Sequence, residues 1–295
     1  MTTTRRALAA ASLLTFAATA CTTDPRGASP MTTSASTSAT IPANGTLLHV
    51  DRRGRGAPLL LVHGGGEDAA MLAEQAEHLA AAGHEVVTYD RRGTGASGRQ
   101  AWPGRGAHQH ADDAAALIDA LGWTDPTVVG VSSGGVIALD LAARHPDRTG
   151  PVIAWEPPAA GNIPGGADAT TAIMAPVDAH LAAHPGDFVG AQALLLASVL
   201  GAPVAVDDPA FAAARANAEP FVRDEPTITT TTLDEHALST ADVTIAAGSA
   251  PNELVAAAVD VLTSITGRPA VRVDADHEVY LTDPSVLTRI VTAAR

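Results

Sequence analysis

The pattern of apolar residues becomes regular at about residue 46 and remains so over most of the chain. Short runs of leucine and β-branched side chains, typical of strands buried on both faces, alternate with longer alanine-rich stretches of helical spacing. Such alternation predicts an α/β fold in which helices flank a mostly parallel central sheet. The expected strands are 47–50, 59–62, 86–89, 127–131, 152–154, 243–247 and 270–273, and the expected helices are 69–82, 111–121, 134–145, 253–266 and 284–294.

The alternation stops between about residues 158 and 240. This part of the chain contains helix-like stretches at 170–183, 188–200 and 209–218, with no strand pattern between them. We therefore expect an inserted helical cap here, placed over the carboxyl edge of the sheet. No internal repeat of fixed period is visible.

The first 45 residues differ from the rest of the chain. Arg5 and Arg6 precede a weakly apolar run at 7–20 that ends at Cys21, the only cysteine. This order is typical of a secretory signal, and the run is too short for a lasting transmembrane helix. Residues 22–44 are rich in Ser and Thr, contain interspersed Pro and have no hydrophobic period, which predicts a flexible segment. The expected domains are a signal peptide at 1–20, a lipid-anchored flexible linker at 21–45 and an α/β domain at 46–295.

The four residues Ala18-Thr19-Ala20-Cys21 resemble the cleavage box of bacterial lipoproteins, with Ala18 where leucine is usual. In those proteins the cysteine thiol receives a diacylglycerol and becomes the new N-terminus. The resemblance implies export and anchoring to the outer face of the bacterial cell membrane through Cys21. Two alternatives stay open: an ordinary signal peptide with an incidental cysteine, and a start at Met31 that would leave the protein in the cytoplasm.

The charge balance limits the classes of partner. Eighteen Lys and Arg against thirty-two Asp and Glu give a formal net charge of -14, which repels phosphate backbones and anionic lipid surfaces. We expect a small-molecule substrate, no nucleic acid, and membrane contact only through the lipid anchor. A single cysteine permits no intramolecular disulfide, and the oligomeric state is not predicted.

The strongest chemical signal is the sequence Gly130-Val131-Ser132-Ser133-Gly134, which follows an expected strand and opens an expected helix. Glycines two residues either side of Ser132 let neighbouring backbone approach a tight turn without a Cβ clash. The turn also places the Ser132 hydroxyl near a helix N-terminus, whose partial positive charge favours a developing anion. We expect Ser132 to be a nucleophile.

Two further segments complete the chemistry that the nucleophile needs. His63-Gly64-Gly65-Gly66 directly follows strand 59–62, and consecutive glycines can turn backbone N–H groups toward a pocket. The sequence predicts an oxyanion hole formed by the amides of Gly65 and Ser133, with His63 fixing the loop. His277 follows the last expected strand, where an imidazole of near-neutral pKa can accept the Ser132 proton as general base.

Four segments, taken in order, resemble the α/β-hydrolase superfamily. They are the strand followed by HGGG, the segment YDRRGTGAS at 89–97, the GVSSG turn and the DHEVYLTDP segment near the end of the chain. The resemblance covers residues 46–295 apart from the cap. It implies eight strands, a chain order of serine, acid and histidine, and no metal or organic cofactor. In the superfamily the segment at 89–97 is a conformational turn, so Asp90, Arg91 and Arg92 are expected to form scaffold ion pairs.

The acid of the triad departs from the common pattern. Many relatives carry an aspartate a few residues past a glycine after the penultimate strand, whereas residues 248–253 read GSAPNE. Glu156 lies at the end of strand 152–154, a position that resembles the source of the acid in some haloalkane dehalogenases. We expect Glu156 to orient the imidazole and stabilise the imidazolium, with Glu253 as the next candidate.

These residues predict acyl transfer by a serine hydrolase of the carboxylesterase or lactonase kind, with a carboxylic ester or lactone as substrate. Amide and carbon–carbon bond cleavage stay open, because the same triad serves them. Dehalogenation and epoxide opening are disfavoured, since those relatives use an aspartate where this chain has Ser132. The rival hypothesis is a catalytically silent ligand-binding protein on the same fold.

Overall fold

The computed structural model describes residues 36–294, apart from 201–202, 206 and 208–210. The expected signal peptide at 1–20, the lipidation site Cys21 and the alternative start Met31 lie outside the described residues. In the described part of the chain, no helix has both the length and the apolar character that crossing a membrane requires.

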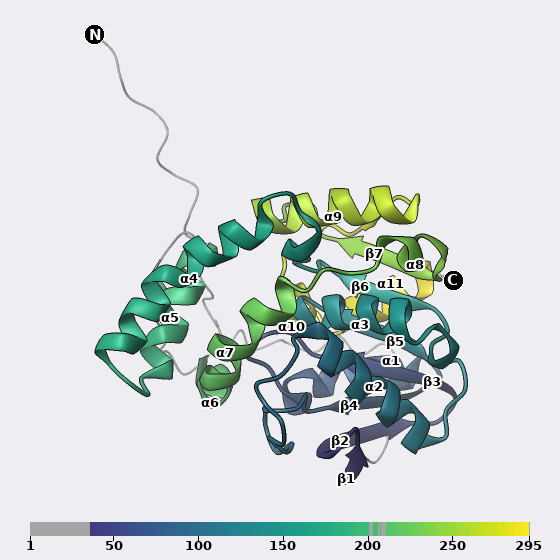
Figure 1. The fold of residues 1–295 in the computed structure, drawn as a ribbon. Coiled ribbons are helices and arrows are strands. Elements are labelled where there is room, and N and C mark those ends of the chain that lie inside the picture. Colours follow the sequence, from purple (N-terminus) through teal and green to yellow (C-terminus); the bar gives the residue numbers. More distant parts are fainter. Residues whose placement is uncertain (1–35, 201–202, 206, 208–210, 295) are drawn as a thin grey trace, which may run out of the picture. The chain divides into compact units, whose positions relative to one another are not determined.

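The described strands form one sheet of eight, in the order β1-β2-β4-β3-β5-β6-β7-β8 (Figure 1). β3 to β8 run parallel, whereas β2 is antiparallel to both β1 and β4. The mostly parallel α/β fold and its eight strands are therefore confirmed. The strands are β1 (Thr37–Ala43), β2 (Thr46–Gly54), β3 (Ala57–Val62), β4 (His84–Tyr89), β5 (Thr127–Val131), β6 (Val152–Trp155), β7 (Val243–Ala247) and β8 (Val271–Arg272).

Helices cover both faces of the sheet, which explains the continuous apolar runs of its central strands. In β3, Leu60 and Val62 pack in one core with α2, α3, α8 and α9, while Leu59 and Leu61 pack in a second core with α1, α10 and α11. The helices of these two layers are η1 (Ala69–Leu72), α1 (Ala73–Ala81), α2 (Ala107–Leu121), α3 (Ser133–Arg144), η2 (Pro146–Arg148), α8 (Glu235–Thr240), α9 (Glu253–Thr266), α10 (Val279–Thr282) and α11 (Val286–Ala293).

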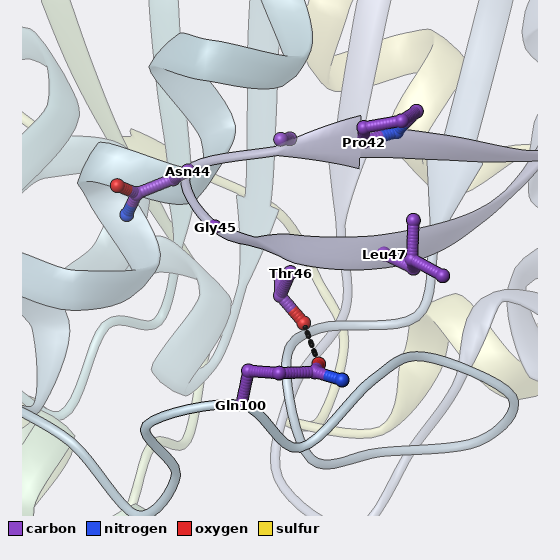
Figure 2. A pocket seen from close by; sticks show the side chains of 7 residues that line it. Pro42, Asn44, Gly45, Thr46, Leu47 and Gln100 are labelled. Atoms are coloured by element: carbon purple, nitrogen blue, oxygen red, sulfur yellow. Dashed lines mark hydrogen bonds between the residues drawn. The ribbon is translucent and has the colours of Figure 1, made fainter.

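Strand β1 corrects the expected linker, because residues 37–43 belong to the sheet. β1 pairs with β2 through a two-residue turn, Asn44-Gly45, in which both residues have positive φ (43° and 74°). Asn-Gly is the strongest sequence signal for such a hairpin. An edge strand of this kind is stabilised by main-chain hydrogen bonds, so it needs no long apolar run and its pattern resembled a linker. Figure 2 shows the turn beside Gln100, which is hydrogen-bonded to Thr46 at 2.7 Å.

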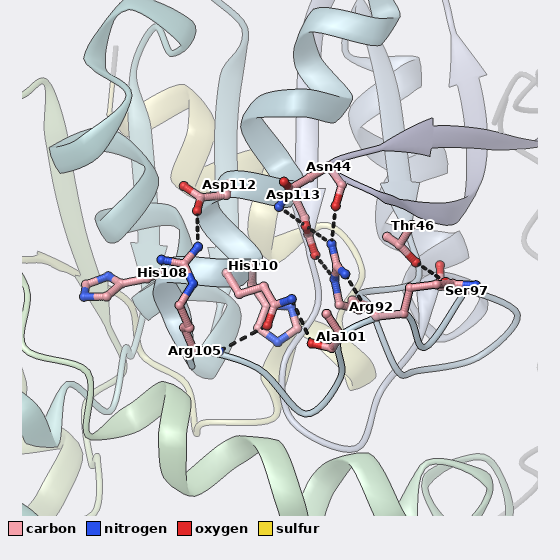
Figure 3. A network of polar contacts seen from close by, with 12 residues as sticks. Asn44, Thr46, Arg92, Ser97, Ala101, Arg105, His108, His110, Asp112 and Asp113 are labelled. Carbon is pink, nitrogen blue, oxygen red and sulfur yellow. Dashed lines mark hydrogen bonds and ion pairs between the residues drawn. The ribbon is translucent and has the colours of Figure 1, made fainter.

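A buried ion pair fixes this hairpin to the rest of the domain. Arg92 Nε and Nη2 donate to the two carboxylate oxygens of Asp113 on α2, at 2.8 and 2.6 Å. The Asn44 side-chain amide donates to Asp113, and the backbone carbonyl oxygen of Asn44 accepts from Arg92, each at 2.7 Å (Figure 3). Arg92 thus forms the scaffold ion pair that the resemblance implied.

Helices follow one another between β6 and β7, in the region of the expected cap. They are η3 (Ala160–Asn162), α4 (Gly166–Ala183), α5 (Phe188–Leu200), α6 (Ala212–Ala216), α7 (Ala218–Thr229) and α8. Helices α4, α5 and α7 share a small separate hydrophobic core, which contains Val177, Ala191, Leu195 and Val222. Leu238 of α8 instead packs in the core of the sheet domain. The separate core of the cap therefore ends with α7, before residue 240, where the cap was expected to end.

Helix α7 was not expected, and its prolines explain why. Pro220 lies in the first turn, where the missing N–H has no intrahelical partner to lose, and Pro226 lies in the interior. The helix is held in place by Asp224, which accepts from His110 of α2 and from the indole of Trp102 in the preceding loop, each at 2.9 Å. α7 therefore connects the cap helices to the sheet domain.

Candidate active site

Ser132 lies on a tight turn between β5 and α3, with φ 52° and ψ -125°. A non-glycine residue with positive φ is strained and persists only where its surroundings enforce it. A Cβ on Gly130 would lie 2.2 Å from the carbonyl oxygen of Gly134, and one on Gly134 would lie 2.4 Å from that of His63. Both flanking glycines are therefore required, and together they leave the Ser132 side chain projecting from the turn.

His277 lies in the loop after β8, and its side chain is about one quarter exposed (27%). The loop is held to the sheet by the indole of Trp155, which donates to the His277 carbonyl oxygen at 2.9 Å. His277 Nε2 is 3.1 Å from Ser132 Oγ, within hydrogen-bond distance. The structure thus brings together a hydroxyl and an imidazole that lie 145 positions apart in the sequence.

The carboxylate beside this imidazole belongs to Glu156, which follows directly after β6 and is fully buried. Its Oε2 is 2.6 Å from His277 Nδ1, and its Oε1 accepts the Gly248 N–H at 2.8 Å. Glu253, the other candidate acid, is exposed in the first turn of α9. A continuous path of hydrogen bonds therefore runs from Glu156 through His277 to Ser132.

Several carboxylates tune the basicity of His277. Burial lowers the pKa of the imidazole, whereas the hydrogen bond to Glu156 and the negative charges of Glu278, Glu156 and Glu67 raise it. The net result is a pKa above the ordinary value of 6.5. His277 is therefore a stronger base than free histidine, and the imidazolium formed on proton uptake is stabilised.

The two expected oxyanion donors belong to the α3 N-terminus and to the loop after β3. Ser133 is the first residue of α3, so its N–H has no intrahelical partner. Gly65 belongs to the loop at residues 63–67, which we call the oxyanion loop after its expected role, and a Cβ on its neighbour Gly64 would lie 3.2 Å from the Ser132 Cβ. Within the described part of the chain, neither the Gly65 nor the Ser133 amide donates a hydrogen bond. Both amides are free to bind an oxygen atom.

Buried Arg91 contacts this loop, and its partner Glu225 was not predicted from the sequence. The guanidinium is 1% exposed and donates to Glu225 of α7 at 2.7 Å, to the Gly64 carbonyl oxygen at 3.2 Å and to Ser133 Oγ at 3.3 Å. A Cβ on Gly65 would lie 2.7 Å from the Glu225 carboxyl carbon. Glu225 therefore lies against the oxyanion loop, and the Arg91–Glu225 pair joins the cap to it.

His63 fixes the oxyanion loop rather than facing Ser132. Its Nδ1 contacts the Gly64 carbonyl oxygen at 2.8 Å, and its Nε2 accepts the Arg91 N–H at 3.1 Å. Burial and the charge of Arg91 hold its pKa well below the usual range, so the ring is neutral. Among the described residues, no group of three or more His, Cys, Asp or Glu side chains is arranged to hold a metal ion.

The part of the chain that carries these features has known counterparts. Residues 57–162 match a protein-family model described as the alpha/beta hydrolase fold, and this range contains the oxyanion loop, the Ser132 turn and Glu156. The chain has the α/β-hydrolase fold, and residues 57–162 carry the match to the family model. Solved structures match a longer part of the chain than the family model does. An alpha/beta hydrolase from Sphaerobacter thermophilus is 24% identical, with a TM-score of 0.68, over 87% of this chain and 99% of that one.

A second solved structure, the enol-lactonase from Burkholderia xenovorans, is 23% identical with a TM-score of 0.61, over 87% of this chain and 99% of that one. Likeness at these identities establishes the shared α/β-hydrolase fold.

Curated relatives match a shorter stretch of this chain. The uncharacterized hydrolase YraK of Bacillus subtilis is 42% identical over 119 residues, 40% of this chain and 44% of YraK. RutD of Azorhizobium caulinodans, provisionally named a carbamate hydrolase, is 42% identical over 34% of this chain and 37% of its own. Rhodomycin D methylesterase DauP of a Streptomyces species is 43% identical over 31% and 32%. The chain spans less than half the length of each of these relatives.

Proposed function

We propose that this protein is a serine hydrolase that cleaves a carboxylic ester or lactone through an acyl-enzyme on Ser132. The observation that carries the proposal is the hydrogen-bonded path Glu156–His277–Ser132 beside two unengaged backbone amides. Nucleophile, base and orienting acid in this geometry form the unit that activates a serine for attack on a carbonyl carbon. The net charge of -14 supports a small-molecule substrate over nucleic acid.

In the first half of the reaction, Ser132 Oγ attacks the carbonyl carbon while His277 Nε2 accepts the hydroxyl proton. The carbonyl oxygen becomes an oxyanion that accepts hydrogen bonds from the amides of Gly65 and Ser133. Glu156 accepts a hydrogen bond from His277 Nδ1–H, which holds the tautomer and stabilises the imidazolium. The carbon–oxygen bond to the leaving group then breaks, and the imidazolium returns the proton to the leaving alkoxide.

In the second half, a water molecule gives a proton to His277 and attacks the acyl carbon. The bond to Ser132 Oγ breaks, the serine recovers its proton from the imidazolium, and the carboxylic acid leaves. With a lactone the released hydroxyl stays on the same molecule as the acid. The names of two relatives support an oxygen ester as substrate, a methylesterase and an enol-lactonase, while the provisional name of RutD keeps amide-like bonds in view.

A panel of p-nitrophenyl esters and lactones of increasing acyl length, assayed with the wild type and Ser132→Ala, tests this proposal. We expect turnover of at least one member and a loss of about 10⁶-fold in Ser132→Ala. Equal residual rates in both proteins, at any chain length, would contradict a serine mechanism.

A catalytically silent binding protein is the alternative, favoured by the missing aspartate after β7. It predicts that the wild type turns over no ester and that Ser132→Ala binds a ligand as tightly as the wild type. An acid at Glu156 that contacts His277 removes the main observation in favour of this alternative.

Export and anchoring are a separate part of the proposal. The N-terminal sequence supports a lipidated N-terminus on the outer face of a bacterial membrane. Its relevant features are Arg5, Arg6, the apolar run at 7–20 and the box ending at Cys21. In cell fractionation with mass spectrometry, the wild type should be in the membrane fraction with a lipid on Cys21, and Cys21→Ala should be released. An unchanged distribution in Cys21→Ala would argue against the anchor.

A further inference from the structure

A second buried carboxylate lies beside the proposed triad. Glu67 ends the oxyanion loop and is 5% exposed. One of its carboxylate oxygens, Oε2, accepts the Gly64 N–H at 2.8 Å, and the other, Oε1, accepts the hydroxyl of Tyr280 at 2.6 Å. The two oxygens therefore bind two different segments of the chain.

Tyr280 belongs to α10, three residues after His277, and its side chain is fully buried. Its carbonyl oxygen accepts from the Gln75 side chain of α1, so both ends of the residue are held. Through Tyr280, the segment that carries His277 is fixed to Glu67 at one side and to α1 at the other.

Gly64 brings Glu67 close to the nucleophile. The point that a Cβ on Gly64 would occupy is 3.2 Å from the Ser132 Cβ and 3.4 Å from Glu67 Oε1. Gly64 is also the residue before Gly65, whose amide is the proposed oxyanion donor. A hydrogen bond to the Gly64 N–H therefore constrains the orientation of the next peptide group.

We propose that Glu67 is a positioning residue, whose carboxylate couples the oxyanion loop to the segment that carries His277 and adds a negative charge that acts on the imidazole. This inference rests on the proposed serine hydrolase. It assigns two effects to one side chain: a mechanical tie between oxyanion donor and base, and an electrostatic effect on the base. The two effects are separable by mutation.

The charged groups around Glu67 bring the titration of its carboxylate into the neutral pH range. Burial and the charge of Glu278 raise the pKa of Glu67 to about 7, against the lowering effects of the Tyr280 and Gly64 hydrogen bonds and the charge of Arg91. His277 in turn faces Glu156 at the end of β6, Glu278 on its own segment and Glu67 on the oxyanion loop, and all three carboxylates raise its pKa against the effect of burial.

The test is a set of steady-state pH profiles with an ester that the wild type turns over. Glu67→Gln keeps the size of the side chain but removes the charge and one acceptor oxygen. We expect kcat to fall about tenfold, the effect of one hydrogen bond, with little change in KM. The acidic limb of kcat/KM should shift to lower pH, because His277 loses a nearby negative charge.

Tyr280→Phe separates the tie from the charge. It removes the hydroxyl but keeps the Glu67 side chain, which still ionises at higher pH, so kcat should fall while the acidic limb shifts to lower pH by less than in Glu67→Gln. Glu74→Gln, an exposed position on α1, is the matched control and should behave as the wild type in both respects.

A folded Glu67→Gln with wild-type kcat and a wild-type acidic limb would overturn the inference. A loss of activity with an unshifted acidic limb would overturn it as well, because that outcome describes a structural residue only. If circular dichroism finds Glu67→Gln unfolded, a wild-type kcat in Tyr280→Phe overturns it. Covalent labelling of wild-type Ser132 by a fluorophosphonate separates these failures from a failure of the proposed function itself.

Discussion

Among single residues, the proposed triad acid Glu156 has an unusual position in the sequence. Glu156 has a positive φ of 43°, is fully buried, and binds both His277 and the Gly248 N–H. A strained residue of this kind is maintained by its contacts, and its oxygens have no access to solvent. The same burial makes the identity of the side chain decisive, because no water can replace it.

Glu156→Gln should lower kcat by about 10⁴-fold, since an amide can donate to His277 Nδ1 and hold the imidazole in the wrong tautomer. Kinetics with a chromogenic ester, combined with thermal unfolding, measure this effect. Glu253→Gln is the control and should keep full activity. A fully active Glu156→Gln would remove this residue from the triad.

The pH dependence of the reaction belongs to the same scale. The proposed base, His277, must be neutral to accept a proton, and its pKa lies above 6.5 because the hydrogen bond to Glu156 and the surrounding carboxylates outweigh burial. kcat/KM should therefore rise with pH and reach half its maximum above pH 6.5. A half-maximum below this value would mean that the carboxylates do not act on the imidazole as described.

At the scale of secondary-structure elements, α7 has a clear influence on the site. Its Glu225 pairs with buried Arg91, which also binds Gly64 and Ser133. Glu219, in the first turn of the same helix, pairs with the exposed Arg99. The two glutamates therefore allow a comparison between a buried and a surface ion pair within a single helix.

Glu225→Ala should lower the free energy of unfolding by about 3–5 kcal/mol, because it leaves the buried Arg91 charge without its partner. Glu219→Ala should change it by less than about 1 kcal/mol, since exposed pairs contribute little. Urea unfolding of the two variants measures the difference. Equal effects would show that the Arg91–Glu225 contact does not hold the cap to the oxyanion loop.

At the scale of the whole molecule, the part of the fold that follows local pattern could be predicted and the part that follows tertiary contact could not. Continuous apolar runs predicted the parallel strands, and the glycines around Ser132 predicted its turn. The edge strand β1 was missed because main-chain pairing through Asn44-Gly45 leaves little trace in apolar periodicity. Helix α7 was missed because Pro220 and Pro226 mask its pattern.

The candidate site divides in the same way. Motif spacing predicted Ser132, His277 and the amides of Gly65 and Ser133, whose catalytic roles stay predictions. Glu67 and Glu225 gave no signal, because each gains its significance from a partner more than 130 residues away, Tyr280 and Arg91 respectively. Such partnerships depend on how the loops and the cap pack, which one sequence does not encode in any local pattern.

The net charge of -14 also has a consequence for the whole molecule. An anionic ester should be repelled as it approaches, and added salt screens that repulsion. We expect kcat/KM for an anionic ester to rise with ionic strength, while the value for a neutral ester of the same acyl length stays constant. Stopped-flow or steady-state rates for such a pair measure this effect, and identical salt dependence for both esters would contradict it.

We propose that Glu156, His277 and Ser132 act as one unit, and covalent labelling with a fluorophosphonate is the decisive test of that cooperation. Peptide mapping by mass spectrometry of the labelled protein identifies the modified residue. We expect one phosphonyl group on Ser132 of the wild type, formed far more slowly in His277→Ala and Glu156→Gln. A wild type that stays unlabelled, or one that is labelled at Ser132 at the same rate as both variants, would contradict it.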